Sequence, residues 1–364
     1  MKLPQLIRII ILFLFALSTS QCEQIPSKKI RFDFTIIEDD KTAVPAADVT
    51  FTFGRIPESS QVVHQGLSDA QGKFVAEDGV VFGLLLTIQK ENYYSIYERD
   101  PLKSIAPDQY DNLRQHSMDI TMRKVRKPIP LLGKVVNRAI AEQNKPIGYD
   151  LEIGDWVKPY GKGVVGDFFV NYSKQMVGYS DGETYESRLQ RMLERHKSNP
   201  QAKKNYLETV NRFHETALDY TYADAIQHNA GKWKGTLHLS FADKDEGIIE
   251  VKDAFLSYSE LTMPHLAPEN GYKKEWNREE DNAKPRINSS EIGYFLRTRI
   301  KRNEKGEIVS ANYSKIVTDW NFDPRGRIEF SYLFNPSAND RNLEFDTKKN
   351  LFSNLANREQ IQKP

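Results

Sequence analysis

The acidic residues around Glu152 are the first candidates for chemistry in this sequence. Glu152 and Asp155 lie three residues apart, and Asp167 follows in the same glycine-rich stretch. Two carboxylates on opposite sides of a glycosidic bond can act as general acid and base, so these residues allow a carbohydrate-active enzyme. The competing explanation is that they are solvated or turn-forming carboxylates, which is the common fate of acidic residues.

Five aromatic residues form a second candidate set: Trp156, Tyr160, Tyr272, Trp276 and Trp320. Several of them lie in segments rich in glycine and proline, which are typical of loops. Exposed aromatic rings can stack on sugar rings or grip a partner protein, so we predict that these residues bind a ligand. The competing explanation is that they pack in a core or between domains.

No motif in the sequence specifies a reaction. A zinc protease needs a second histidine four residues after His214, and Leu218 stands there instead. Residues 243–247 resemble a calcium loop but lack the later acidic ligand of an EF-hand, so we expect a hairpin turn. Phosphate-loop and Gly-x-Ser-x-Gly spacings do not occur. We therefore predict no catalytic residue, no metal site and no cofactor.

The N-terminus predicts export. Lys2 and Arg8 precede an apolar run at residues 9–17, and small polar residues follow it. The run is too short to span a bilayer, so we predict that residues 1–21 are a cleaved signal peptide. The protein is then expected in the periplasm or elsewhere in the cell envelope.

Cys22 is the single cysteine of the chain and directly follows this segment. A bacterial lipoprotein carries its lipid on a cysteine at that place, so Cys22 is a possible lipidation site and membrane tether. Gln21 departs from the small residue expected before such a cysteine, and cleavage near Ser20 would leave Cys22 incidental. Both alternatives stay open.

Composition limits the partners and favours β structure. Charged residues make up 28% of the 364 residues, and the formal net charge is +1 with both signs well mixed. Nucleic-acid binding needs clustered basic charge, so we predict no nucleic-acid partner. The many aromatic residues are consistent with strands, and the length allows two domains.

Strand-like runs alternate with turns over residues 28–125. The sequence SDAQGKF at residues 68–74 is a turn followed by a strand, and LTIQKENYY at residues 86–94 is a strand that ends at two tyrosines. This pattern resembles the carboxypeptidase regulatory-like module, with Asn92 in place of the usual glycine. The resemblance implies an immunoglobulin-like or transthyretin-like β-sandwich. It names no activity, because such modules usually serve as spacers or partner surfaces.

The rest of the chain predicts a second, larger domain. Residues 126–147 contain prolines and basic residues and are predicted to be a linker, and residues 148–352 a β-rich, sandwich-like domain. Residues 183–222 have helical spacing and are predicted to be an inserted helical hairpin, residues 264–290 a long loop, and residues 353–364 a C-terminal tail.

Three stretches of the second domain carry a further resemblance: YDLEIGDWVKPYGKG (residues 149–163), APENGY (267–272) and NDRNLEFD (339–346). They look like those of uncharacterised exported bacterial proteins that pair a regulatory-like module with a β domain. The leading hypothesis is therefore a non-catalytic binding or structural protein of the cell envelope, with a glycan or protein partner. The alternative is a carbohydrate-active enzyme or an accessory to one, using carboxylates and aromatics of the second domain.

Overall fold

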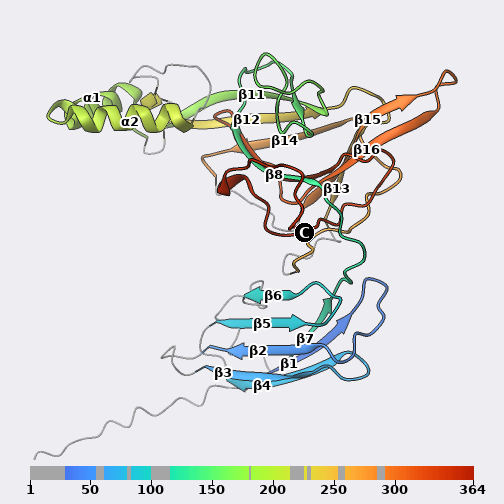
Figure 1. The fold of residues 1–364 in the computed structure, drawn as a ribbon. Helices are drawn as coiled ribbons and strands as arrows, with labels where there is room; N and C mark the ends of the chain where they lie inside the picture. The colour runs from blue at the N-terminus through green and yellow to red at the C-terminus, as the bar shows by residue number, and fades with distance from the viewer. Residues whose placement is uncertain are drawn as a thin grey trace, which may run out of the picture.

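The computed structural model describes residues 29–54, 61–79, 83–99, 115–179, 182–213, 225–227, 231–252, 259–284 and 292–364. In these residues the protein is mostly β and forms two sandwich-like domains (Figure 1). The predicted signal peptide, Cys22 and residues 214–222 of the predicted insertion lie outside the described residues. No helix in the described part is long and apolar enough to cross a membrane.

The first domain is a β-sandwich of two sheets. One sheet has the order β4 (Lys73–Gly79), β1 (Lys29–Ile37), β7 (Gln115–Thr121), and the other β3 (Val62–Leu67), β2 (Asp48–Phe53), β5 (Leu84–Gln89), β6 (Ile96–Arg99). Only the β1–β7 pair among them is parallel. Alternate residues of β1 and β2 point inward, and Phe32 meets Phe51 edge to face with ring centroids 4.8 Å apart. Such pairs stabilise the core beyond their burial.

The turn that the sequence predicted before β4 has the expected chemistry. Gly72 has φ 74°, and a Cβ there would lie 2.2 Å from the carbonyl oxygen of Ile36. The Asp69 carboxylate accepts hydrogen bonds from the backbone amides of Gln71 and Lys73, at 2.9 and 2.8 Å. Asn92, which replaces a glycine of the regulatory-like pattern, has φ 64°. Glycine and asparagine are the residues that adopt this left-handed conformation most readily.

The second domain is also built from two sheets. One has the order β10 (Asp155–Trp156), β9 (Ile147–Asp150), β11 (Phe168–Tyr179), β12 (Gly231–Ser240), β14 (Glu275–Asp281). The other has the order β13 (Gly247–Val251), β15 (Gly293–Arg302), β16 (Ile308–Ile316), β18 (Arg327–Asn335), β17 (Asn321–Asp323), with β8 (Leu132–Ala139) also paired to β18. Buried side chains of both sheets form one hydrophobic core between them.

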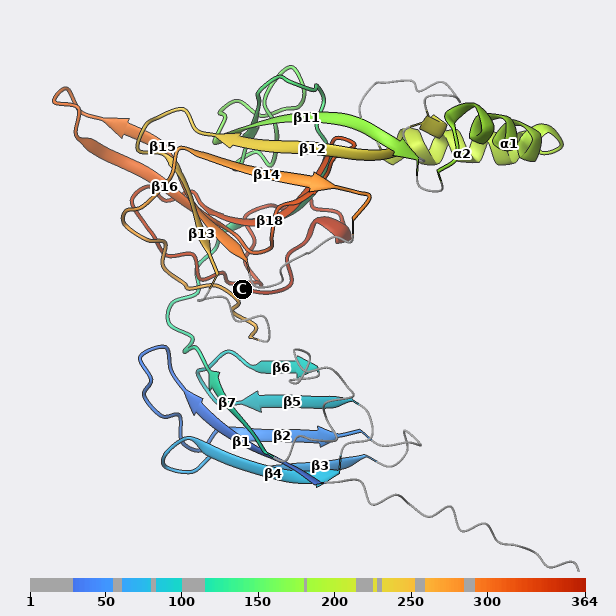
Figure 2. The same cartoon turned by 180° about the vertical axis from the view of Figure 1, so that it is seen from behind.

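A helical hairpin is inserted between β11 and β12, as predicted. It consists of α1 (Tyr185–Lys197) and α2 (Pro200–Phe213), and both views show it extending beyond the end of the two strands (Figures 1 and 2). The Thr184 hydroxyl caps α1 by accepting a hydrogen bond from the amide of Ser187 at 3.2 Å. No residue of α1 is buried. The predicted tail contains the short 3-10 helix η2 (Asn357–Glu359).

Two predicted irregular segments contain strands. Residues 132–139 of the predicted linker form β8, and residues 275–281 of the predicted long loop form β14. The proline-containing part of the linker, residues 126–131, does lie outside the strands. β14 escaped detection because its inward-pointing residues include Arg278 and Glu280, which form an ion pair at 2.5 Å, so hydrophobic alternation is missing.

Candidate functional site

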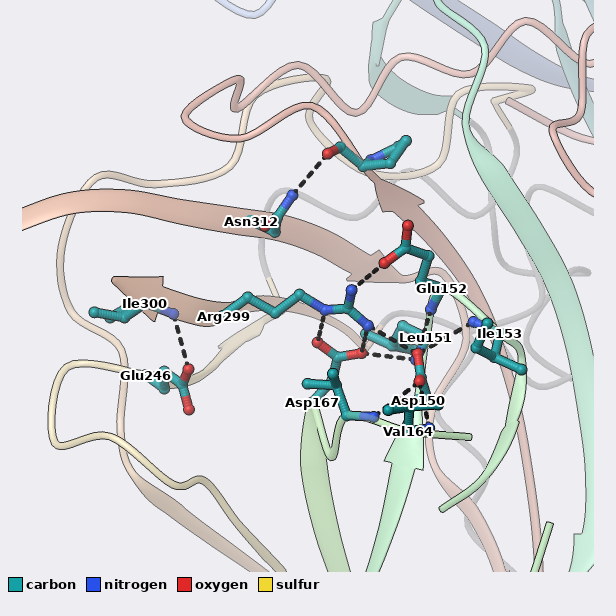
Figure 3. A network of polar contacts seen from close by, with 12 residues as sticks. Asp150, Leu151, Glu152, Ile153, Val164, Asp167, Glu246, Arg299, Ile300 and Asn312 are labelled. Atoms are coloured by element: carbon teal, nitrogen blue, oxygen red, sulfur yellow. Dashed lines mark hydrogen bonds and ion pairs between the residues drawn. The ribbon is translucent and has the colours of Figure 1, made fainter. Parts of the chain in front are cut away.

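The side chain of Asp150 joins two loops of the second domain (Figure 3). Its Oδ1 accepts hydrogen bonds from the amides of Glu152 and Ile153, each at 3.1 Å. Its Oδ2 accepts hydrogen bonds from the amides of Val164 and Val165, at 2.9 and 3.0 Å. One carboxylate at the end of β9 therefore fixes the backbone on both sides of the glycine-rich stretch.

Arg299 on β15 completes this cluster. Its guanidinium binds Asp167 through two hydrogen bonds of 2.8 and 2.9 Å, and its Nη2 donates to Asp150 at 2.8 Å. Its Nη1 pairs with Glu152, and Asp167 also accepts a hydrogen bond from the amide of Leu151 at 2.7 Å. We call Asp150, Glu152, Asp167 and Arg299 the acid–arginine cluster. Bidentate pairing of this kind fixes geometry as well as charge.

Burial and pairing act in opposite directions on the pKa values in this cluster. Burial raises the pKa of Asp167, and its hydrogen bonds with Arg299 only partly oppose that effect. For Asp150, burial is outweighed by the backbone amides and by Arg299, so its pKa is lowered. The pKa of Arg299 is raised because its three carboxylates outweigh the cost of burial. The charges therefore stabilise one another in place.

Two of the three candidate acids, Glu152 and Asp167, belong to the acid–arginine cluster. Asp155 lies outside it. The Asp167 side chain is fully buried, whereas that of Glu152 is 48% exposed. Asp155 accepts hydrogen bonds from the amides of Trp156 and Lys162, at 2.9 and 3.0 Å. General acid–base work on a glycoside needs two carboxylates that face a common open space. In this arrangement Asp155 and Asp167 bind neighbouring protein groups, and Glu152 alone is substantially exposed.

The loop at residues 243–247 is a turn, but it connects two sheets. β12 and β13 flank it and belong to different sheets, so the expected hairpin is wrong. Asp243 and Asp245 both bind the guanidinium of Arg302, at 2.7 and 2.5 Å. A single arginine thus pairs with both carboxylates that resembled calcium ligands. His214 lies outside the described residues, and within those residues no three His, Cys, Asp or Glu side chains are grouped as a metal site.

Two of the predicted ligand-binding aromatics are core residues. Trp156 is 2% exposed and Trp320 is 0% exposed. Trp156 packs edge to face on Tyr149 at 5.2 Å, and Trp320 lies 4.7 Å from Phe330, both measured between ring centroids. Neither ring has a free face for a sugar, so in these two positions core packing is the explanation that holds.

The other three predicted aromatics are partly buried and are not gathered on one surface. Tyr160 and Trp276 border the main core of the second domain, whereas Tyr272 borders a separate cluster around Tyr313. The guanidinium of Arg297 lies 4.7 Å from the centre of the Tyr272 ring. Binding of a ligand by Tyr160, Tyr272 and Trp276 stays a prediction.

A buried polar contact that the sequence did not indicate joins the two domains. Glu344 is 0% exposed and accepts hydrogen bonds from the hydroxyl of Tyr94 at 2.9 Å and from the amides of Arg126 and Lys127 at 2.8 and 2.6 Å. Burial, together with the neighbouring Glu344, raises the pKa of Tyr94. We call this contact, with Arg123 described next, the junction.

Arg123 extends the junction from the end of the first domain. It is 5% exposed, and its Nη1 donates to the carbonyl oxygens of Leu261 and Thr262, each at 3.2 Å. An isolated β-bridge between Ile96 and Ser259 adds a backbone contact. Charged groups that are buried with hydrogen-bond partners fix one geometry, because any other arrangement would leave them unpaired.

No protein-family model and no curated protein matches this chain. It is similar to the structure of a catechol 1,2-dioxygenase mutant from Acinetobacter radioresistens, with 9% identity, coverage of 29% of this chain and 54% of that chain, and a TM-score of 0.24. A streptococcal ancillary pilin matches with 10% identity, coverage of 39% and 47%, and a TM-score of 0.21. BcpA, the major pilin subunit of Bacillus cereus, matches with 10% identity, coverage of 84% and 95%, and a TM-score of 0.21.

The aligned part of this chain spans about half the length of the dioxygenase (54%) and of the ancillary pilin (47%). With TM-scores of 0.24 and 0.21, these likenesses carry no argument about activity or partners. The functional argument therefore rests on the side chains of this chain.

Proposed function

We propose that this chain is an exported, non-catalytic protein of the cell envelope that binds or spaces its partners. The observation that carries the proposal is the junction. Glu344 and Arg123 are both buried there and hydrogen-bond across the boundary between the sandwiches. Two domains held in one orientation suit a protein that positions a binding surface, because rigid spacing needs a fixed interdomain angle.

The acid–arginine cluster supports the same proposal. Its buried carboxylates hold backbone amides of two loops and one guanidinium, which is a structural arrangement. The alternative function, a carbohydrate-active enzyme or accessory, would rely on Glu152, whose side chain is half exposed. We further propose that the first domain is a carboxypeptidase regulatory-like module and that residues 1–21 direct export. Lipidation of Cys22 and simple secretion are the two forms that this export could take.

Small-angle X-ray scattering of the purified protein and a Glu344→Ala variant tests the spacer proposal. We expect the wild-type curve to fit a single two-domain shape. The variant leaves the Tyr94 hydroxyl and two amides without their acceptor, so we expect a larger radius of gyration and a broader distance distribution. Lys349→Ala, which removes an exposed ion pair with Asp346, is the matched control and should change nothing.

Three outcomes would contradict the proposal. A wild-type curve that requires a mixture of interdomain angles would refute the rigid spacer. Release of reducing sugar ends from polysaccharides by the wild type, lost on Glu152→Gln, would establish the enzyme instead. Recovery of the full-length protein in the cytoplasm after cell fractionation would refute export. The membrane-bound fraction of a Cys22→Ser variant, compared with that of the wild type, would show whether a lipid tether exists.

A further inference from the structure

A polar groove crosses the outer face of the sheet formed by β11, β12 and β14. Its volume is about 830 Å³, within the usual range for ligand pockets. Its floor consists of two rows of directly paired residues, which are Ser173–Thr236–Glu279 and Gln175–Lys234–Asp281. The neighbouring Tyr172 and Leu237 point the other way and are buried in the core, so these rows face outward. Figure 2 shows the three strands side by side in this sheet.

Three side chains of the groove are available for a ligand. Ser173, Gln175 and Thr236 have no side-chain hydrogen-bond partner anywhere in the described residues. Ser173 and Gln175 are exposed, and Thr236 is partly exposed between them. Asn144 lines one end, and its backbone amide is anchored to the carbonyl oxygen of Tyr172 at 2.8 Å. The groove thus presents hydroxyl and amide groups on a rigid sheet.

The charges on the groove nearly balance. It is lined by four basic residues (Lys174, Lys234, Arg278 and Lys284) and three acidic ones (Glu279, Glu280 and Asp281), and Lys234 lies 3.8 Å from Asp281 across the floor. Neither row contains an aliphatic or aromatic residue. A polyanion would meet three carboxylates, and an apolar ligand would leave polar groups without partners. The ligand must therefore bring many hydrogen-bonding groups and little net charge.

We propose that this groove binds an uncharged, hydroxyl-rich glycan. Sugar hydroxyls both donate and accept hydrogen bonds, so they can pair with Ser173, Gln175 and Thr236 and with the charged groups at the side. A peptide strand cannot pair with β12, which is already paired with β11 and β14, and would have to add at the edge of the sheet along β14 instead of across the groove floor. This inference rests on the proposed function and specifies its ligand class and surface.

Co-sedimentation with insoluble chitin, cellulose and purified peptidoglycan tests the groove. We compare the wild type with the double variant Thr236→Val/Gln175→Ala, which keeps the strand shape and removes two hydrogen-bonding groups. The control is Thr50→Val/Gln65→Ala, which makes the same two substitutions on neighbouring strands of the first domain, away from the groove. We expect binding to at least one polymer, a dissociation constant at least tenfold higher for the groove variant, and no change for the control.

Amide hydrogen exchange with soluble fragments of the bound polymer provides a second measurement. We expect protection in β11, β12 and β14. The groove proposal is overturned if no polymer is bound, if the groove variant binds like the wild type, or if binding is limited to polyanions and abolished by salt. These results would leave the spacer proposal standing, since its scattering and fractionation tests are independent of any glycan.

Discussion

Replacing Lys315 by methionine tests how the second domain accommodates a buried amine. Lys315 on β16 is 0% exposed, and its Nζ has no hydrogen-bond partner within the part of the chain that the structure describes. Its neighbours on the adjoining strands are Phe295 and Leu333. Burial lowers its pKa from 10.5 to about 7, helped by Arg123 and opposed by Glu344. Methionine has a similar length and no charge, so it can occupy the same space.

The magnitude follows from the difference between the folded and unfolded pKa values. At pH 7 the unfolded chain holds the proton firmly, whereas the folded Lys315 is half deprotonated, with a pKa of about 7 against 10.5. This difference corresponds to an upper bound of about 4 kcal/mol of destabilisation near pH 7. We therefore expect Lys315→Met to raise the free energy of unfolding by roughly 2–4 kcal/mol at that pH, allowing for relaxation around the amine.

The sign of the pH dependence is fixed by the lowered pKa. Between pH 7 and 10.5 the unfolded state binds more protons at this site than the folded state, so wild-type stability rises with pH. From pH 7 to 9 this lysine alone should add about 2 kcal/mol to the wild type. The difference in the free energy of unfolding between Lys315→Met and the wild type should shrink by the same amount from pH 7 to 9.

Urea denaturation of both proteins at pH 6, 7, 8 and 9 measures the effect. Lys301→Met on the neighbouring strand β15 is the matched control, because Lys301 is exposed. The control should change the free energy of unfolding by less than about 0.5 kcal/mol. A loss of stability greater than about 1 kcal/mol in Lys315→Met would refute the reasoning, because it would mean that the amine has a stabilising partner in the folded protein.

Three further substitutions test other features. Asp150→Ala removes the acceptor of four backbone amides and a partner of Arg299. We therefore expect thermal and urea denaturation to show that the free energy of unfolding falls by about 3–5 kcal/mol. A fall of less than about 1 kcal/mol would show that the two loops do not depend on this carboxylate. Gly72→Ala introduces a Cβ 2.2 Å from the carbonyl oxygen of Ile36, at a residue with φ 74°. It should lower the free energy of unfolding by at least about 1 kcal/mol. An unchanged melting temperature would contradict the requirement for glycine in this turn. Arg302→Ala breaks partly exposed ion pairs and should cost only about 1 kcal/mol in urea denaturation, so a loss above about 3 kcal/mol would mean that they are essential to the fold.

The first domain could be predicted from local signals. Alternating apolar residues fix the face of β1 and β2 that is buried, and turn residues such as Gly72 and Asn92 mark the connections. β14 could not be found in this way, because Arg278 points inward and is paired with Glu280. When a charged residue points inward as part of an ion pair, the sequence alone gives no indication that it does so.

The junction lay beyond sequence reasoning for a different reason. Tyr94 and Glu344 are separated by 250 residues, and no local pattern pairs one with the other. The partner of a buried charge is set by tertiary packing, so it appears only once the chain has folded. The same is true of Arg299, which closes the acid–arginine cluster from 132 residues beyond Asp167.

The glycine-rich stretch around Trp156 shows how a correct local signal can suggest the wrong function. Its glycines do mark irregular backbone, which favoured an exposed loop with an aromatic ring for a ligand. Yet a Cβ at Gly161 would lie 2.4 Å from the carbonyl oxygen of Trp156, so the glycine is needed for close packing of the loop on the strand. The ring of Trp156 itself packs on Tyr149 and is 2% exposed, so the loop does not display it. The groove of β11, β12 and β14, where Ser173 and Thr236 have no side-chain partner among the described residues, is the surface on which we propose that a glycan binds.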